Sequence, residues 1–271
     1  MSDSSIERAT ARMKAAEPDK KDRSRELNSV APNEPTDIAN ALTLKLDGLP
    51  DVDGAEDSVK REVYEEFRVL KRALLGSTYE SSNASPENLI MVTSITGKAG
   101  KTFASLMLAR SLSMEPNKHA LIVDADVFNS TLTGQFTPSP SIGLGDFLLD
   151  NSVDTKSVIY PTNVERLRVI PMGNCNPMMN ELLNSDRMSS LLQEFKERYR
   201  DRLVIFDAPP LLRSNVAMTL AEKMDQIIIL IEPGVTKTAD LKSVQEHLPS
   251  HVDVKYVLNK SLETNNWAKE Q

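Results

Sequence analysis

The sequence has little cysteine, little histidine and no long apolar run, and each shortage excludes a class of protein. The single cysteine among 271 residues, Cys175, excludes an intramolecular disulfide and fits a reducing compartment. The three histidines, His119, His247 and His251, are not spaced with that cysteine as zinc ligands, so we expect no zinc site. The longest apolar run, 227–231, is far shorter than the roughly 18 residues of a membrane span.

Two further absences narrow the class of protein. The N-terminus lacks the apolar segment of a signal peptide. The net charge of −7 argues against a nucleic-acid partner. The hydrophobic content of 40% is enough for one α/β core with a tail. We therefore expect a soluble, cytoplasmic protein that binds no nucleic acid.

Composition divides the chain into three stretches. Residues 1–55 are rich in Ser, Asp, Lys, Asn and Pro, and predict a disordered or weakly structured arm. Residues 56–262 predict one α/β domain, and 263–271 a short tail. At the start of the domain, apolar residues recur at helical spacing over 57–75, and Gly76 is expected to end this helix.

From residue 88 onward, apolar strands alternate with helices. Near-continuous apolar strands separated by helices predict a mostly parallel sheet with helices on both faces. In such a sheet, ligands bind at the carboxyl ends of the strands. The expected strands are 89–93, 120–124, 166–171, 203–207, 226–231 and 252–258, and the expected helices are 102–113, 144–150, 178–200, 215–224 and 237–247.

The first of these strands leads into a Gly-Lys-Thr triplet at 100–102 that opens a helix. This order is typical of a phosphate-binding loop, in which backbone amides hold a polyphosphate at a helix N-terminus. Lys101 is expected to contact the β and γ phosphates, and the Thr102 hydroxyl to bind Mg²⁺. Ile95 stands where the complete pattern has a glycine. The expected cofactor-binding residues here are Gly97, Lys98, Ala99, Gly100, Lys101, Thr102 and Phe103.

Three aspartates lie at the ends of two predicted strands. Asp124 and Asp126 follow one apolar strand, and Asp207 ends another. A carboxylate there is costly unless it is solvated, paired or bound to a metal, and Mg²⁺ takes such oxygen ligands. We expect Asp207 to bind Mg²⁺, and Asp124 and Asp126 either to hold the metal or to act as a general base. The expected catalytic residues are Lys101, Asp124, Asp126 and Asp207, and the expected metal ligands are Thr102, Asp124 and Asp207.

Together, the motifs at 100–102, 124–126 and 206–210 resemble the Walker A, A′ and B motifs of the bacterial tyrosine kinases. These are P-loop autokinases of exopolysaccharide and capsule loci, related to the MinD and ParA ATPases. Within this family the chain is most similar to the autokinase subgroup tied to exosortase-associated polysaccharide export. The helix at 57–75 also resembles the family's E-x-x-R-x-x-R helix, at Glu65, Arg68 and Lys71.

The resemblance implies an ATP- and Mg²⁺-dependent protein-tyrosine (auto)kinase or kinase-like regulator of exopolysaccharide biosynthesis or export. It implies that Asp124 or Asp126 assists deprotonation of a tyrosine hydroxyl, and that Asn259 hydrogen-bonds adenine. It also implies a homo-oligomer joined through the residues of the E-x-x-R-x-x-R helix. The implied partner is a transmembrane regulator of polysaccharide chain length or an adaptor, which would place the chain at the inner face of the membrane.

The chain departs from the family pattern at several positions. Residues 261–271 contain no tyrosine, whereas the kinases end in a tyrosine cluster. Residues 127–131 supply neither the Arg nor the Pro that usually follow the A′ motif, and Lys98 stands where relatives often carry glycine. Two alternatives therefore stay open: a MinD/ParA-type ATPase switch without protein phosphorylation, and a non-catalytic ATP-binding adaptor. Thr96, where those ATPases carry a signature lysine, argues against the first alternative.

Overall fold

The computed structural model does not describe the whole chain. The expected arm, apart from four of its residues, and the tail at 263–271 lie outside the described part. No helix of the described part is long and apolar enough to cross a membrane. The described residues are 41–44, 58–80, 87–199 and 201–261.

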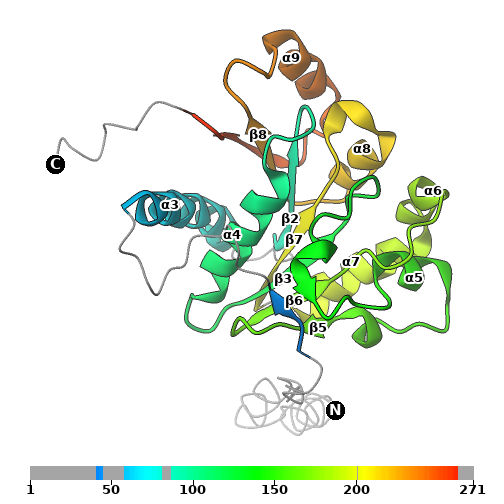
Figure 1. Ribbon diagram of the computed structural model, residues 1–271. Helices are drawn as coiled ribbons and strands as arrows, with labels where there is room; N and C mark the ends of the chain where they lie inside the picture. Colours follow the sequence, from blue (N-terminus) through cyan, green and yellow to red (C-terminus); the bar gives the residue numbers. More distant parts are fainter. Residues whose placement is uncertain (1–40, 45–57, 81–86, 200, 262–271) are drawn as a thin grey trace, which may run out of the picture. The chain divides into compact units, whose positions relative to one another are not determined.

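A seven-stranded sheet lies at the centre of the described part of the domain (Figure 1). Its strands are β2 (Leu89–Ser94), β3 (His119–Asp124), β5 (Tyr160–Pro161), β6 (Leu167–Ile170), β7 (Arg202–Asp207), β8 (Gln226–Ile231) and β9 (Asp253–Leu258). The strand order is β5-β6-β3-β7-β2-β8-β9. Every neighbouring pair is parallel except β5 with β6. This confirms the predicted, mostly parallel sheet.

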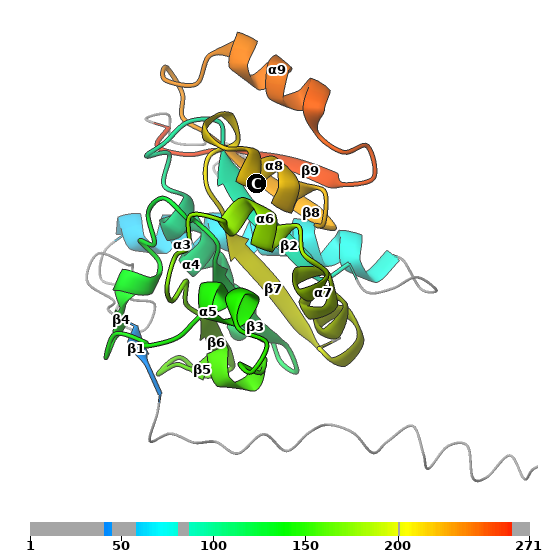
Figure 2. The same cartoon turned by 90° about the vertical axis from the view of Figure 1, so that its right-hand side faces the viewer.

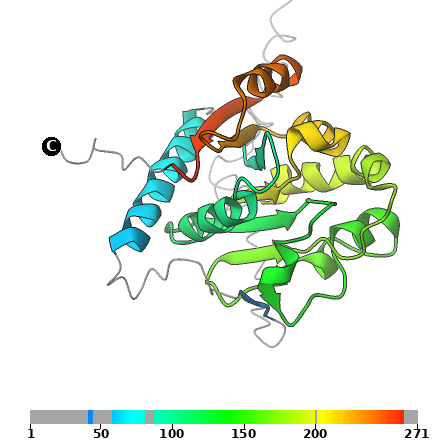
Figure 3. The ribbon, with the colours of Figure 1, turned by 45° about the horizontal axis from the view of Figure 1, so that its top comes forward.

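Helices cover both faces of this sheet (Figures 1 and 2). One face carries α3 (Ser58–Glu80) and α4 (Lys101–Ser113), which lie side by side (Figure 3). The other face carries α5 (Leu144–Leu149), α6 (Met179–Leu183), α7 (Asp186–Arg198), α8 (Asn215–Ala221) and α9 (Thr238–His247). Because both faces are covered, the inner strands are apolar on both sides. In β2, Leu89 and Met91 enter one core, and Ile90 and Val92 enter the other.

Two predicted helix boundaries are wrong. Helix α3 does not end at Gly76 but continues to Glu80, because a single glycine inside a helix costs only about 1 kcal/mol relative to alanine and does not by itself end it. The predicted helix at 178–200 is two helices, α6 and α7. Ser185 interrupts it, because its backbone is extended and its hydroxyl accepts a hydrogen bond from the Met188 amide as an N-cap. The other predicted elements are present, with boundaries that differ by at most three residues.

Of the arm predicted to be disordered or weakly structured, the structure describes residues 41–44. These residues include β1 (Thr43–Leu44), which pairs antiparallel with β4 (Phe136–Thr137). Leu42 and Leu44 are only 3% and 2% exposed, because their alternate spacing turns both side chains toward the core beneath α4. The Leu44 amide also donates a hydrogen bond to the Asn163 side chain. This short segment therefore belongs to the domain.

Candidate nucleotide-binding site

The phosphate loop, residues 95–100, joins the end of β2 to the start of α4. Gly100 caps the helix with φ at +89°, a left-handed conformation that favours glycine. A Cβ at Gly100 would lie 2.4 Å from Nδ2 of Asn259, so space also requires glycine here. Ile95, which replaces the glycine of the full motif, has a fully buried side chain in the core. The structure thus has the strand, turn and helix of the predicted loop, with an apolar anchor at its beginning.

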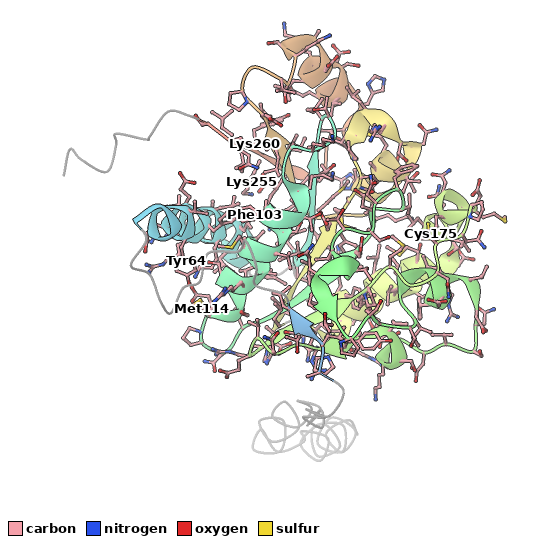
Figure 4. All side chains as sticks on the ribbon, viewed as in Figure 1. Tyr64, Phe103, Met114, Cys175, Lys255 and Lys260 are labelled. Atoms are coloured by element: carbon pink, nitrogen blue, oxygen red, sulfur yellow. The ribbon has the colours of Figure 1, made fainter. Side chains whose placement is uncertain are left out.

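The residues after β9 hold one side of the loop. Asn259 Nδ2 donates a hydrogen bond to the Ala99 carbonyl at 2.7 Å, and Lys260 Nζ donates to the Lys98 carbonyl at 2.7 Å. Lys260, labelled in Figure 4, also forms an ion pair with Glu232 at 3.1 Å. Lys98 has φ at +66°, so this lysine adopts the conformation for which relatives often carry glycine. Asn259 therefore lies at the loop itself, and sequence reasoning missed Lys260 and Glu232.

Lys101 is paired with an aspartate. Its Nζ lies 3.6 Å from Oδ2 of Asp126, and the two residues are 9% and 4% exposed. The other oxygen of Asp126 accepts hydrogen bonds from the amides of Phe128 and Asn129, both at 3.2 Å. These bonds fix the carboxylate, so the predicted phosphate lysine and one predicted catalytic aspartate form a single buried unit.

Asp207 is fully buried at the end of β7. The Thr102 hydroxyl donates to its Oδ2 at 2.7 Å, and the Ser105 hydroxyl donates to its Oδ1 at 3.2 Å. Burial raises the pKa of Asp207 to about 7, although the Thr102 hydrogen bond opposes the rise. The neighbouring carboxylates of Asp124 and Asp126 raise the pKa further. A cation bound here would favour the ionised form, as expected for a metal ligand. Sequence reasoning missed Ser105.

Asp124 is fully buried and bound to a residue that sequence reasoning missed. The Thr133 amide and hydroxyl, in the short 3-10 helix η2 (Thr133–Gln135), donate to its Oδ2 at 2.9 and 2.6 Å. The Asp126 amide donates to its Oδ1 at 3.3 Å. Burial raises the pKa of Asp124 to about 6, although the Thr133 hydrogen bonds oppose the rise. Nothing in the sequence around Thr133 indicates this contact. It depends on the path of the chain after β3, which brings η2 back against the end of that strand.

Strand register brings the predicted site together. Asp124 and Asp207 are direct partners across β3 and β7, and Val92 of β2 is the partner of Asp207 on the other side. The described residues include no group of three His, Cys, Asp or Glu side chains arranged to hold a metal alone. Mg²⁺ bound with a nucleotide needs fewer, because phosphate oxygens and waters complete its shell. A hydroxyl and a carboxylate beside a phosphate loop fit that need, and the site is that of a P-loop nucleotide-binding protein.

Phe103 joins the loop helix to α3. Its ring packs edge to face against Phe67 of α3, with centroids 6.1 Å apart (Figure 4). This predicted cofactor-binding residue therefore contacts α3 and lies in the first turn of α4, directly after Thr102. Gly97, the first predicted loop residue, lies beside the side chain of Arg213, which sequence reasoning also missed.

One of the three α3 residues that the resemblance assigns to a subunit contact does not lie on the exposed surface. Glu65 and Arg68 are exposed and form an ion pair at 2.8 Å, as their spacing predicts. Lys71, however, is only 8% exposed, and its Nζ bonds Glu115 at 2.5 Å and the Ser111 carbonyl at 3.3 Å. Lys71 lies three residues after Arg68, but its side chain points toward α4. Its contacts are therefore within this chain.

Three comparisons with known proteins agree with this geometry. The family model described as "AAA domain" matches residues 87–264. Tyrosine-protein kinase CpsD of Streptococcus agalactiae serotype III (strain NEM316) is 31% identical over 164 residues, which cover 60% of this chain and 69% of that protein. The solved kinase domain of Escherichia coli tyrosine kinase ETK is 26% identical with a TM-score of 0.66, covering 83% of this chain and 92% of that one.

A more distant structure shows the fold alone. The cell division ATPase MinD of Pyrococcus furiosus is 21% identical with a TM-score of 0.52, covering 66% of this chain and 74% of that one. Fold and site thus define a P-loop nucleotide-binding protein. The match to the family model shows that the chain belongs to the AAA-domain family. The match to CpsD shows that, within this family, it belongs to the bacterial tyrosine-protein kinases. Membership implies that the loop binds a nucleotide.

Proposed function

We propose that this chain is an ATP- and Mg²⁺-dependent protein-tyrosine kinase that acts in exopolysaccharide biosynthesis or export, with the exosortase-associated group as its setting. One geometric observation carries the proposal: Lys101, Asp124, Asp126 and Asp207 meet beside the phosphate loop at the carboxyl edge of the sheet. The relatives that share this family carry the name tyrosine-protein kinase.

Thr102 and Asp207 are the residues that would hold Mg²⁺, with Asp124 as the second carboxylate. The Thr102 hydroxyl and the Asp207 carboxylate are already in contact, at 2.7 Å, so both oxygens face one point. When bound, Mg²⁺ neutralises the charge that develops on the transferring phosphoryl group. Lys101 contacts the β and γ phosphates, and Asn259 supports the loop in addition to any contact with adenine.

Asp126 is the better candidate for the general base. Its Oδ2 faces Lys101, the group that reaches the phosphates, at 3.6 Å. Both oxygens of Asp124 instead accept hydrogen bonds from Thr133 and from the Asp126 amide. In the transfer step, the tyrosine oxygen bonds the γ phosphorus, ADP leaves with the electrons of the broken P–O bond, and the carboxylate takes the phenolic proton.

Phosphotyrosine mapping by mass spectrometry after incubation with Mg-ATP tests the proposal. The chain itself, or a separate peptide substrate, should gain phosphotyrosine. Tyr256 is the most exposed of the tyrosines whose side chains are described, at 42%, and is the expected site within the chain. Asp126→Asn should lower phosphoryl transfer by at least about a hundredfold. Asp240→Asn on α9 is the control and should not change it.

Other outcomes of this experiment separate the alternatives. ATP hydrolysis without phosphotyrosine would support a MinD/ParA-type switch. Binding of Mg-ATP without any turnover would support an adaptor. Transfer that is equal in Asp124→Asn, Asp126→Asn and wild type would show that both carboxylates are structural.

We propose further that the chain self-associates through α3 and acts with a transmembrane regulator of polysaccharide chain length. The support for α3 is its exposed surface: the side chains of Arg68 and Glu65 are 48% and 56% exposed, and Val69, next to Arg68, is 47% exposed. An exposed apolar residue beside an ion pair is a surface that a second copy can bury. Lys71 no longer belongs to this surface.

A further inference from the structure

The segment that follows Asp207 lies against the phosphate loop. It forms the short 3-10 helix η4 (Leu211–Arg213). The Leu212 amide donates to the Ile95 carbonyl at 3.4 Å, and the Thr93 hydroxyl donates to the Pro209 carbonyl at 2.7 Å. The buried side chain of Leu211 also fixes η4 in the core. The backbone that carries Arg213 is therefore held to the strand and loop that carry the phosphate site.

The guanidinium of Arg213 lies over Gly97. Its Nη1 is 3.5 Å from the position that a Cβ on Gly97 would take, and glycine leaves this space open. Among the described residues, no carboxylate forms an ion pair with Arg213, and its side chain is exposed. A guanidinium that no described carboxylate engages can bind the phosphate oxygens of a ligand at the loop it lies on.

The two halves of the phosphate loop contact different residues. Asn259 and Lys260 bind the carbonyls of Ala99 and Lys98 from the β9 side. Arg213 instead lies over the earlier half of the loop, at Gly97, on the segment that follows β7. The helix N-terminus at 100–102 would hold the β phosphate, and Thr102 and Asp207 would hold a Mg²⁺ that neutralises phosphate charge. A guanidinium over the earlier half of the loop, at Gly97, is positioned to reach the γ phosphate of a bound triphosphate.

The charge of the site also favours a second cation. Lys101 is already paired with Asp126, and two further carboxylates, Asp124 and Asp207, lie close by. The segment 127–131, directly after Asp126, contains no Lys or Arg. A triphosphate adds more negative charge to this position. Arg213 supplies a planar fork of donors that matches two phosphate oxygens.

We propose that Arg213 is an arginine finger supplied by the chain itself, which contacts the γ phosphate and stabilises it during transfer. The inference rests on the proposed function and names a further catalytic residue for it. The guanidinium binds the equatorial oxygens of the phosphoryl group while the bond to the bridging β–γ oxygen breaks and the bond to the acceptor oxygen forms.

Calorimetry and single-turnover kinetics on the full chain test this role. Arg213→Ala should bind Mg-ADP within about twofold of wild type but bind Mg-AMP-PNP, a non-hydrolysable ATP analogue, up to about tenfold more weakly. Phosphoryl transfer or ATP hydrolysis should fall by about a thousandfold or more, the loss expected for an arginine finger. Arg213→Lys should recover little, because an ammonium cannot bind bidentately. Arg198→Ala, at an exposed ion pair on α7, is the matched control and should change nothing.

Several outcomes would overturn the inference. Equal losses of ADP and AMP-PNP affinity in Arg213→Ala, with an unchanged melting temperature, would place the guanidinium on the other phosphates. Wild-type affinity and turnover in Arg213→Ala would make it a surface residue. If the wild type binds nucleotide but transfers nothing, the proposed kinase function fails, and the difference between ADP and AMP-PNP still decides the contact of Arg213. A wild type that binds no nucleotide would overturn both proposals.

Discussion

Lys71 and Arg68, which the resemblance assigns to one subunit contact on α3, have different surroundings in the structure. Lys71 faces inward, where its Nζ bonds Glu115 and the carbonyl of Ser111. Arg68, three residues earlier, faces solvent with Glu65. We expect Lys71→Ala to destabilise the domain and Arg68→Ala to leave its stability unchanged. If α3 joins subunits, Arg68→Ala should instead weaken self-association.

The magnitude follows from burial. An exposed ion pair contributes about 0–1 kcal/mol, and breaking a fully buried one costs about 3–5 kcal/mol. The Lys71 side chain is 10% exposed and that of Glu115 is 34% exposed, so their pair lies between these limits. The Lys71 cation also lies near the carboxyl end of α4, where the helix dipole favours it. We therefore expect Lys71→Ala to cost about 1–3 kcal/mol, which lowers the melting temperature by about 3–10 °C.

Urea unfolding of the two single variants, with light scattering in Mg-ATP, measures both effects. The neighbouring contact of the Tyr64 hydroxyl with the Met114 sulfur, at 2.6 Å, offers a control (Figure 4). Tyr64→Phe removes only that hydroxyl and should cost less than Lys71→Ala. The reasoning would be refuted if Lys71→Ala unfolds at the wild-type urea concentration, or if Arg68→Ala is the less stable variant. Equal mass for wild type and Arg68→Ala would remove that residue from any subunit contact.

Three further predictions concern the nucleotide site. Lys101→Met should weaken Mg-ATP binding by roughly tenfold to a hundredfold in calorimetry, because a charge-assisted phosphate contact contributes about 1.5–3 kcal/mol. Gly100→Ala should cost about 1–3 kcal/mol in urea unfolding, because alanine is strained at this positive φ and its Cβ would collide with Asn259. Burial raises the pKa of Asp207 from 3.8 to about 7, so stability from its protonated form is fully present below pH 4 and lost as the pH rises through 7. In EDTA, Asp207→Asn should thus be more stable than wild type at pH 8 by about 1–4 kcal/mol, a difference that shrinks toward pH 4 in thermal unfolding.

The parallel sheet could be predicted because each inner strand is apolar on both faces and each crossover has helical periodicity. Ile90 and Met91 enter opposite cores, so the run that contains them has no polar face that would indicate a half-exposed strand. The break at Ser185 is local, whereas the structured residues 41–44 depend on contacts distant in sequence. The burial of Leu42 and Leu44 depends on β4 and Asn163, more than 90 residues later. The composition of residues 41–44 and their neighbours in sequence does not predict such distant partners.

The site shows the same division. The positions of Lys101, Thr102 and Asp207 could be predicted because the strand ends fix them at one edge of the sheet. The direction of the Lys71 side chain could not be predicted. Helical spacing gives its angular position around the helix axis, but not which neighbouring helix lies on that side. The hydrogen bond from Thr133 to Asp124 requires the path of the chain after β3, which no motif specifies.

Without a bound cation, the buried carboxylates of this site destabilise the folded state when they are ionised. Burial raises the pKa of Asp124 to about 6 and that of Asp207 to about 7. The carboxylate of Asp126 adds to the rise in both pKa values, and that of Asp124 adds to the rise for Asp207. The loop, in contrast, is held by ties that do not require a ligand, from Asn259 and Lys260 on one side and η4 on the other. The backbone amides are thus positioned in advance, and the unfavourable charge is relieved when Mg²⁺ binds. Because binding to the folded state adds to stability by mass action, the stabilisation by Mg-nucleotide should be largest above pH 7, where the unrelieved cost is greatest.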